Sequence, residues 1–151
     1  MTKLHVTDFL DESLLQEMLT KRYVKRTEHP VYDLSILNYT SKAQFDNVWN
    51  PVTESCRGLI ISRDGFLVAR PFKKFFNLSQ VSPLETPSGT FSTYEKLDGS
   101  LGILYKSPDG FKIATRGSFT SDQAVWASAI WDERYHDVAV PEDKTLLFEI
   151  I

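Results

Sequence analysis

Three Asp-Gly dipeptides, at 64–65, 98–99 and 109–110, place the strongest constraint on how this chain can fold. Asp-Gly suits the two positive-φ positions of a tight hairpin turn, and each pair here is flanked by runs typical of β-strands. The sequence therefore predicts a largely antiparallel sheet built from hairpins. The expected strands are residues 31–37, 58–62, 66–70, 90–97, 101–106, 111–115 and 145–151.

Two helices are predicted on either side of these hairpins. Leucines and a methionine recur at helical spacing from 10 to 19, after a capping Thr7 or Asp8. A second helix is expected to begin near Thr120, which has capping-box spacing to Gln123, and to end around Tyr135. We expect its inward residues to be Val125, Trp126, Ala129 and Ile130. A helix, then hairpins, a helix and a strand indicate the α+β class.

Composition narrows the functional classes. A chain of 151 residues has the size of one domain, and its single cysteine, Cys56, excludes an internal disulfide and a cysteine zinc cluster. No apolar run is long enough for a membrane span, and the first residues lack the core of a signal peptide, which favours a cytoplasmic protein without a membrane partner. Because the formal charge is −3, any polyanion must meet a local basic surface.

The chain ends in an unusual way. Residues 146–151 read as a buried strand, yet they finish on a free carboxylate, which is costly to bury. We therefore expect residues 1–151 to be the N-terminal part of a domain, with further domain(s) after 151.

Lys96, Asp98 and Gly99 form the most suggestive short motif. By itself, Lys96 could be a solvated strand residue beside a hairpin turn. A basic cluster elsewhere in the chain favours a functional role for this motif, because five basic residues and only one acid lie from Arg57 to Lys74. A second cluster, 21–26, either complements the dipole of the first helix or forms a basic arm for RNA.

One acidic residue also stands out. Glu149 lies within an apolar strand, where a glutamate usually has a partner or a task, unless it sits on an edge strand and faces water. By contrast, His5, His29 and His136 lack the spacing of metal ligands. No Gly-x-x-x-x-Gly-Lys loop occurs, which excludes a P-loop ATPase.

Taken in order, these motifs resemble the adenylyltransferase domain of the phage-type RNA ligases, within the covalent nucleotidyltransferase superfamily of DNA ligases and mRNA capping enzymes. The resemblance runs from about Tyr32 to Ile151. The matching residues are Cys56-Arg57-Gly58, Arg70-Pro71-x-x-Lys74-Phe75-Phe76-Asn77, Lys96-x-Asp98-Gly99-Ser100-Leu101, Arg116-Gly117-Ser118 and Phe148-Glu149.

The resemblance implies a three-step, ATP-dependent RNA ligation. Lys96 would attack the α-phosphorus of ATP, the AMP would pass to an RNA 5′-phosphate, and a 3′-hydroxyl would displace it. Only a neutral amine attacks, so nearby cations and Mg²⁺ on the triphosphate are expected to favour that form of Lys96. The implied partners are ATP and RNA, as single-stranded ends or a cleaved tRNA.

The family pattern also assigns roles to individual residues. Arg57 and Lys74 would contact the ATP phosphates, and Arg116 stands where relatives carry an essential basic residue. Glu149 would contact the ribose or a metal-bound water. Supporting positions are Asp98, expected on the same strand face as Lys96, the Gly99 turn, Phe76 in the nucleotide pocket, and Leu37 as an apolar wall where some relatives have an aromatic residue.

Two other functions fit parts of the sequence. A DNA ligase or a GTP-using capping enzyme shares the lysine motif, although the Lys-Phe-Phe-Asn element favours an RNA ligase. A non-catalytic, ligase-like binding module is the other alternative. The family's last two nucleotide motifs and its RNA-specificity domain are expected after Ile151. The activity of residues 1–151 alone is therefore a separate question from that of the intact protein.

Overall fold

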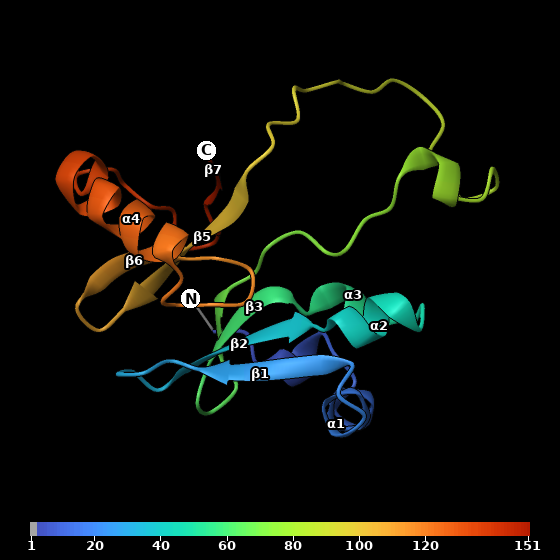
Figure 1. The fold of residues 1–151 in the computed structure, drawn as a ribbon, viewed down its shortest axis with the longest axis horizontal. Coiled ribbons are helices and arrows are strands. Elements are labelled where there is room, and N and C mark those ends of the chain that lie inside the picture. Colours follow the sequence, from blue (N-terminus) through green and yellow to red (C-terminus); the bar gives the residue numbers. More distant parts are fainter. Residues whose placement is uncertain (1–2) are drawn as a thin grey trace.

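The computed structural model describes residues 3–151 and contains two antiparallel sheets (Figure 1). The four strands of the first sheet are ordered β1-β2-β3-β4, and the three of the second are ordered β6-β5-β7. This arrangement confirms the α+β prediction. The strands are β1 (Val24–Glu28), β2 (Leu34–Tyr39), β3 (Arg57–Ser62), β4 (Leu67–Ala69), β5 (Ser100–Ser107), β6 (Gly110–Ala114) and β7 (Leu147–Ile150).

Short helices flank the sheets. The first predicted helix is present but begins later than expected, because Asp11, rather than Thr7 or Asp8, caps it by accepting a 2.7 Å hydrogen bond from the Leu14 amide. The helical elements are η1 (Val6–Asp8), α1 (Glu12–Thr20), α2 (Ser41–Phe45), α3 (Pro51–Ser55), η2 (Leu78–Gln80), α4 (Asp122–Ile130) and a π-helical turn, η3 (Trp131–Tyr135), that continues α4.

The helix predicted near Thr120 also forms and ends at Tyr135, but two details were wrong. Its cap is Ser121, whose hydroxyl accepts from the Ala124 amide. Its buried face carries Ala124 and Ala127, whereas Val125 and Trp126 are 59% and 55% exposed. The Ser128 hydroxyl explains this rotation, since it accepts from the Ile113 amide at 2.9 Å and donates to the Ile113 carbonyl at 3.2 Å, which turns the small residues toward β6.

Two of the three Asp-Gly hairpins are confirmed and one was wrong. Asp64-Gly65 joins β3 to β4, and Asp109-Gly110 joins β5 to β6. Asp98-Gly99 does not form a hairpin turn, and residues 91–98 form no strand. The reason is that β6 and β7 already occupy the two edges of β5, so the segment before β5 has no edge to pair with.

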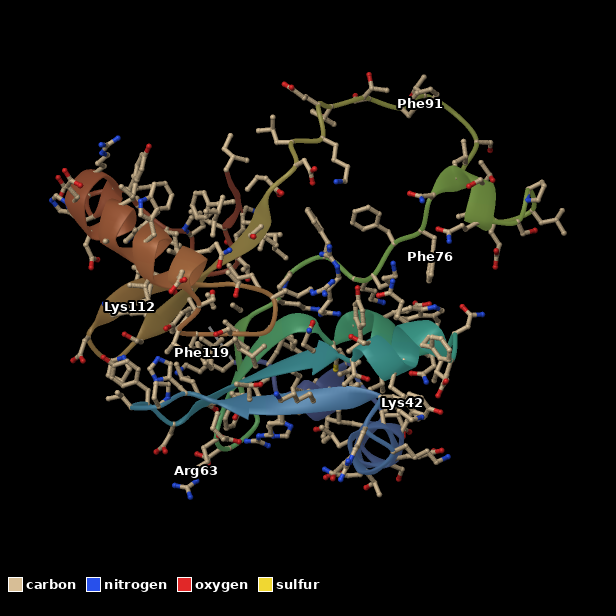
Figure 2. All side chains as sticks on the ribbon, viewed as in Figure 1. Lys42, Arg63, Phe76, Phe91, Lys112 and Phe119 are labelled. Atoms are coloured by element: carbon tan, nitrogen blue, oxygen red, sulfur yellow. The ribbon has the colours of Figure 1, made fainter. Side chains whose placement is uncertain are left out.

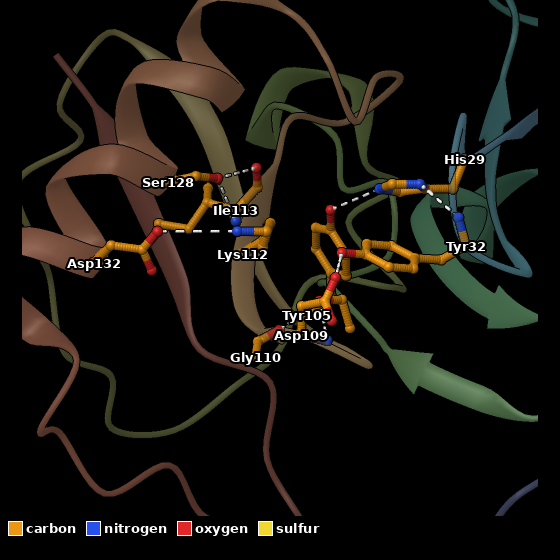
Figure 3. Close-up of polar contacts among 10 residues, drawn as sticks. His29, Tyr32, Tyr105, Asp109, Gly110, Lys112, Ile113, Ser128 and Asp132 are labelled. Carbon is orange, nitrogen blue, oxygen red and sulfur yellow. Dashed lines mark hydrogen bonds and ion pairs between the residues drawn. The ribbon is translucent and has the colours of Figure 1, made fainter.

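The two sheets pack against each other through a shared apolar cluster. It draws Ile36 and Ile60 from the first sheet and Ile103 and Tyr105 from the second, all fully or almost fully buried. Polar contacts add to it: Tyr32 donates to the Asp109 carboxylate, and His29 Nε2 lies 3.3 Å from the Tyr105 hydroxyl (Figure 3). These contacts fix the sheets against each other beside the cavity described below.

His29 makes the packing between the sheets sensitive to pH. Its Nδ1 accepts hydrogen bonds from the Val31 and Tyr32 amides, at 3.0 and 3.1 Å, and protonation of Nδ1 would break both. Burial lowers the pKa of His29 below its usual range. The unfolded chain therefore takes up a proton first as the pH falls below about 6.5.

We expect the free energy of unfolding to be highest above that pH and to fall as acid protonates His29. A His29→Gln variant should show a flatter dependence between about pH 7 and pH 5 in denaturant titrations. Equal slopes for His29→Gln and wild type would contradict this role.

Candidate active site

A cavity of about 1350 Å³ is lined by both sheets and by the long segment between β4 and β5. Figure 1 shows this segment swinging out from the sheets and returning to β5. Phe76 lies on its inner part, while Phe91, which is 87% exposed, lies on its outer arc (Figure 2). Segments far apart in sequence thus meet around one space, as is typical of ligand sites.

The charged lining of the cavity is mainly basic. Five cationic side chains, from Arg57, Lys73, Lys74, Lys96 and Arg116, face two carboxylates, from Glu95 and Glu149. A concave surface with excess charge of one sign concentrates ligands of the opposite sign. Within a chain of charge −3, this is the local basic surface that a polyanion requires.

Arg57 is the first residue of β3 and lines the large cavity. Its guanidinium carbon lies 5.5 Å from the centre of the Phe75 ring, and the side chain is half-buried. Gly58 follows with a φ of +83°, and a Cβ there would lie 2.5 Å from Ile103 Cδ1 and 3.2 Å from the Arg116 carbonyl oxygen. Only glycine therefore lets β3 approach β5 and the Arg116 loop so closely.

Lys74 is positioned by its backbone and by two aromatic rings. Its amide donates to the Glu54 carbonyl at 2.8 Å, which ties the segment after β4 to α3. Its ammonium lies 4.9 Å from the centre of the Phe76 ring and 5.3 Å from that of Trp49. Cation–π attraction of this kind stabilises the charge without neutralising it.

Arg116 lies in the loop after β6 and is tied to the first sheet. Its Nη1 donates a 2.7 Å hydrogen bond to the Tyr39 hydroxyl, and its guanidinium carbon lies 4.8 Å from the centre of that ring. A guanidinium has five N–H donors, so this bond leaves others for a ligand. The contact joins β2 to the loop and fixes the cation at the cavity wall.

Lys96 lines the same cavity from the irregular segment that precedes β5, and its side chain is exposed. Because this segment is not a strand, the expected alternation that placed Lys96 and Asp98 on one strand face does not apply. Asp98 is not among the lining residues, whereas Gly99 is.

Glu149 connects the end of that segment to the second sheet. It lies on β7, an edge strand, and is exposed, as one of its two predicted settings required. Its Oε1 accepts a 2.9 Å hydrogen bond from the Gly99 amide. A Cβ on Gly99 would collide with the Ile150 carbonyl, so glycine is needed for the chain to pass β7 here. Glu149 therefore has both an exposed position and a partner.

Two expectations about the nucleotide pocket change in the structure. Leu37 is 1% exposed and packs in the core of the first sheet, so it forms no cavity wall. Phe76 stacks edge-on against Trp49 at 5.6 Å and is not among the lining residues. The neighbour of Leu37, Asn38, faces the cavity instead, because successive strand residues point to opposite faces. Strand alternation from a buried Leu37 could have indicated Asn38, whereas no sequence signal indicated Tyr39, whose hydroxyl binds Arg116.

Cys56 has a structural role. It is fully buried next to Arg57, and burial raises the pKa of its thiol to about 12. Among residues 3–151, no three His, Cys, Asp or Glu side chains gather where they could hold a metal ion. Within the same residues, no helix has the length and apolar character needed to cross a membrane.

Comparison with known proteins connects this geometry to a family. The model of the RNA ligase family matches residues 55–146, which is more than half of the chain and includes Arg57, Lys74, Lys96 and Arg116. Glu149 lies just beyond the matched region.

A viral relative agrees with this match. A protein of Autographa californica nuclear polyhedrosis virus, described as a bifunctional polynucleotide kinase/RNA ligase, is 34% identical over 126 residues. The match covers 76% of this chain and 18% of the relative, so the chain spans about a fifth of that protein's length. The chain therefore belongs to the phage-type RNA ligase family that its motifs resemble.

Proposed function

We propose that this chain carries the nucleotide-binding site of an ATP-dependent RNA ligase and that Lys96 becomes covalently attached to AMP. One observation supports this above all: Arg57, Lys74, Lys96, Arg116 and Glu149, which span 93 positions of the sequence, line a single cavity. A basic cavity with a lysine next to the start of β5 suits attack on a nucleoside triphosphate.

In the first step, the neutral amine of Lys96 forms a bond to the α-phosphorus of ATP. The bond between that phosphorus and the pyrophosphate oxygen breaks, and the amine loses a proton. Negative charge builds on the departing pyrophosphate, so Arg57, Lys74 and Arg116 would stabilise the transition state more than the bound substrate. Mg²⁺ would be held mainly by triphosphate oxygens and would offset part of the same charge.

Glu149 would accept a hydrogen bond from a ribose hydroxyl or from a water bound to the metal. One of its oxygens accepts from the Gly99 amide, and a carboxylate has several more acceptor sites for a sugar hydroxyl or a bound water. Because the structure gathers no cluster of three such groups in residues 3–151, Mg²⁺ would rely on the nucleotide for most of its ligands.

Two transfers to RNA complete the proposed reaction. An oxygen of an RNA 5′-phosphate attacks the phosphorus of lysyl-AMP, the nitrogen–phosphorus bond breaks, and the lysine is released. The 3′-hydroxyl of a second end then attacks the 5′-phosphate, AMP leaves, and a phosphodiester forms. Single-stranded ends, or the two halves of a cleaved tRNA, are the proposed substrates.

Labelling tests the first step. The intact protein, incubated with Mg²⁺ and ATP labelled at the α-phosphate, is expected to acquire a covalent label that peptide mass spectrometry assigns to Lys96. The same ATP labelled at the γ-phosphate should leave no label, because that phosphate departs with pyrophosphate. A label on another residue, or a label retained from the γ-phosphate, would contradict the mechanism.

The alternatives give different results in the same assay. A capping-type enzyme would label more readily with GTP, and a DNA ligase would transfer the AMP to nicked DNA rather than to single-stranded RNA. A non-catalytic module would show neither a label nor a thermal shift with ATP. The RNA ligase proposal requires ATP preference and transfer to RNA.

A further inference from the structure

A second, smaller hollow of about 300 Å³ opens beside the large cavity. Asn38, Arg116 and Gly117 line both spaces, so a ligand in one lies next to a ligand in the other. The remaining wall comes from β1, the end of β2 and the start of α2. Of the residues that line the smaller hollow, only Arg116 has been given a role in binding the nucleotide.

Pairing of β1 with β2 builds this hollow. Lys25 is the partner of Asn38 in the antiparallel register, and directly opposed residues project on the same face of a sheet. Thr27, two residues along β1, shares that face with Lys25. The sheet therefore holds Lys25, Thr27 and Asn38, while α2 and the loop after β6 supply the rest of the wall.

The charge of the hollow is wholly positive. Lys25 and Arg116 line it together with hydroxyl and amide side chains, and no lining residue is an aspartate or a glutamate. In a chain with an excess of acidic residues, a hollow free of carboxylates favours an anion. In complexes with nucleic acids, lysine and arginine side chains commonly bind the backbone phosphates.

The amide of Asn38 indicates a second kind of contact. In the described part of the chain, its Oδ1 is the one buried side-chain polar atom without a hydrogen-bond partner. A phosphate offers only acceptors, so it cannot satisfy this oxygen. A ribose 2′-hydroxyl can donate as well as accept, and it distinguishes RNA from DNA. Because this oxygen is buried, the amide must turn about its Cβ–Cγ bond to present it to such a hydroxyl, and the oxygen has no hydrogen bond to lose in that turn.

We infer that the small hollow binds a ribose-phosphate unit of the RNA strand. Lys25 and Arg116 contact the phosphate, and Asn38 contacts the 2′-hydroxyl. This inference rests on the proposed function, since it takes the adjoining cavity as the nucleotide site. It adds an RNA-binding subsite within residues 25–117 and makes Asn38 a residue that selects RNA.

The role of Lys25 is tested by RNA binding at several salt concentrations. For a short single-stranded RNA, the Lys25→Ala variant of the intact protein is expected to bind several-fold more weakly, and the slope of log affinity against log salt should fall by roughly one contact. Lys106→Ala removes an exposed lysine of β5 that lines neither space and should match wild type. An unchanged slope for Lys25→Ala would overturn the phosphate contact.

The role of Asn38 is tested by the ratio of RNA to DNA affinity, using oligonucleotides of one sequence. Asn38→Leu keeps the size of the side chain but removes its amide, and we expect the ratio to fall several-fold. A ratio equal to that of wild type would overturn the hydroxyl contact. Thermal unfolding of each variant checks that the fold is kept.

Labelling with ATP in the absence of RNA separates this inference from the proposed function. If wild type forms no lysyl-AMP, the proposed function fails. If wild type labels normally but RNA affinity is insensitive to Lys25 and Asn38, only the inference fails.

Discussion

Replacing Lys96 with alanine is expected to abolish the AMP label on the protein. No other group can take the place of a missing nucleophile, and such losses in covalent catalysis are on the order of 10⁶-fold. Because Lys96 is exposed on an irregular segment at the cavity edge, its replacement should leave the fold intact, which thermal unfolding checks directly. The measurement is the rate of label formation from α-labelled ATP.

A conservative variant sharpens this test. Lys96→Arg keeps the positive charge, but a guanidinium stays protonated and cannot attack phosphorus, so its label should be lost as completely as with alanine. Lys106→Ala should label at the wild-type rate. Retained charge with no label would assign Lys96 a covalent role rather than an electrostatic one. Label on the Lys96→Ala protein at the wild-type rate would refute that role.

The second large effect is expected at Arg116. Its guanidinium is fixed at the cavity wall by the Tyr39 hydroxyl and ring, so its charge is already placed when pyrophosphate begins to leave. Loss of one such pre-positioned group typically slows a reaction by about 10²–10³-fold. We therefore expect Arg116→Ala to slow label formation by that factor, measured under single-turnover conditions.

Two further variants separate the charge of Arg116 from its placement. Arg116→Lys should recover part of the rate, because it restores the charge but not the planar donor set. Tyr39→Phe keeps the ring and removes the 2.7 Å hydrogen bond, so it should cost less than Arg116→Ala. Lys112→Ala serves as the control. It removes a lysine that does not line the cavity and whose ammonium lies 3.9 Å from the Asp132 carboxylate. A wild-type rate for Arg116→Ala would contradict the assigned role.

Features with a local physical cause could be predicted from the sequence. Asp64-Gly65 and Asp109-Gly110 form their hairpins because the glycine of each pair takes a positive φ, +87° and +117°, and strands on both sides can pair. The aspartates do not take the positive φ that the dipeptide pattern predicted. The charge excess between Arg57 and Lys74 likewise needs no tertiary information. The sequence therefore indicated the chemical types of the site residues, but not their positions in space.

Features that depend on neighbours were missed or misplaced. The strand β1 is an edge strand whose burial is mostly low, so its charged sequence gives little β signal. At α3, Asn50 caps a short helix and Pro51 occupies its first turn, where proline is tolerated. Both outcomes depend on what packs nearby.

By itself, the sequence determined the α+β class, two of its hairpins and the set of basic residues that the cavity displays. Only the tertiary structure decided that Asp98-Gly99 is not a turn, that Leu37 faces the core while Asn38 faces the cavity, and that Arg116 is bonded to Tyr39. The physical reason is that turn chemistry and charge are carried by adjacent residues. Strand edges, sheet faces and the approach of β3 at Gly58 are set instead by chain segments that are far apart in sequence.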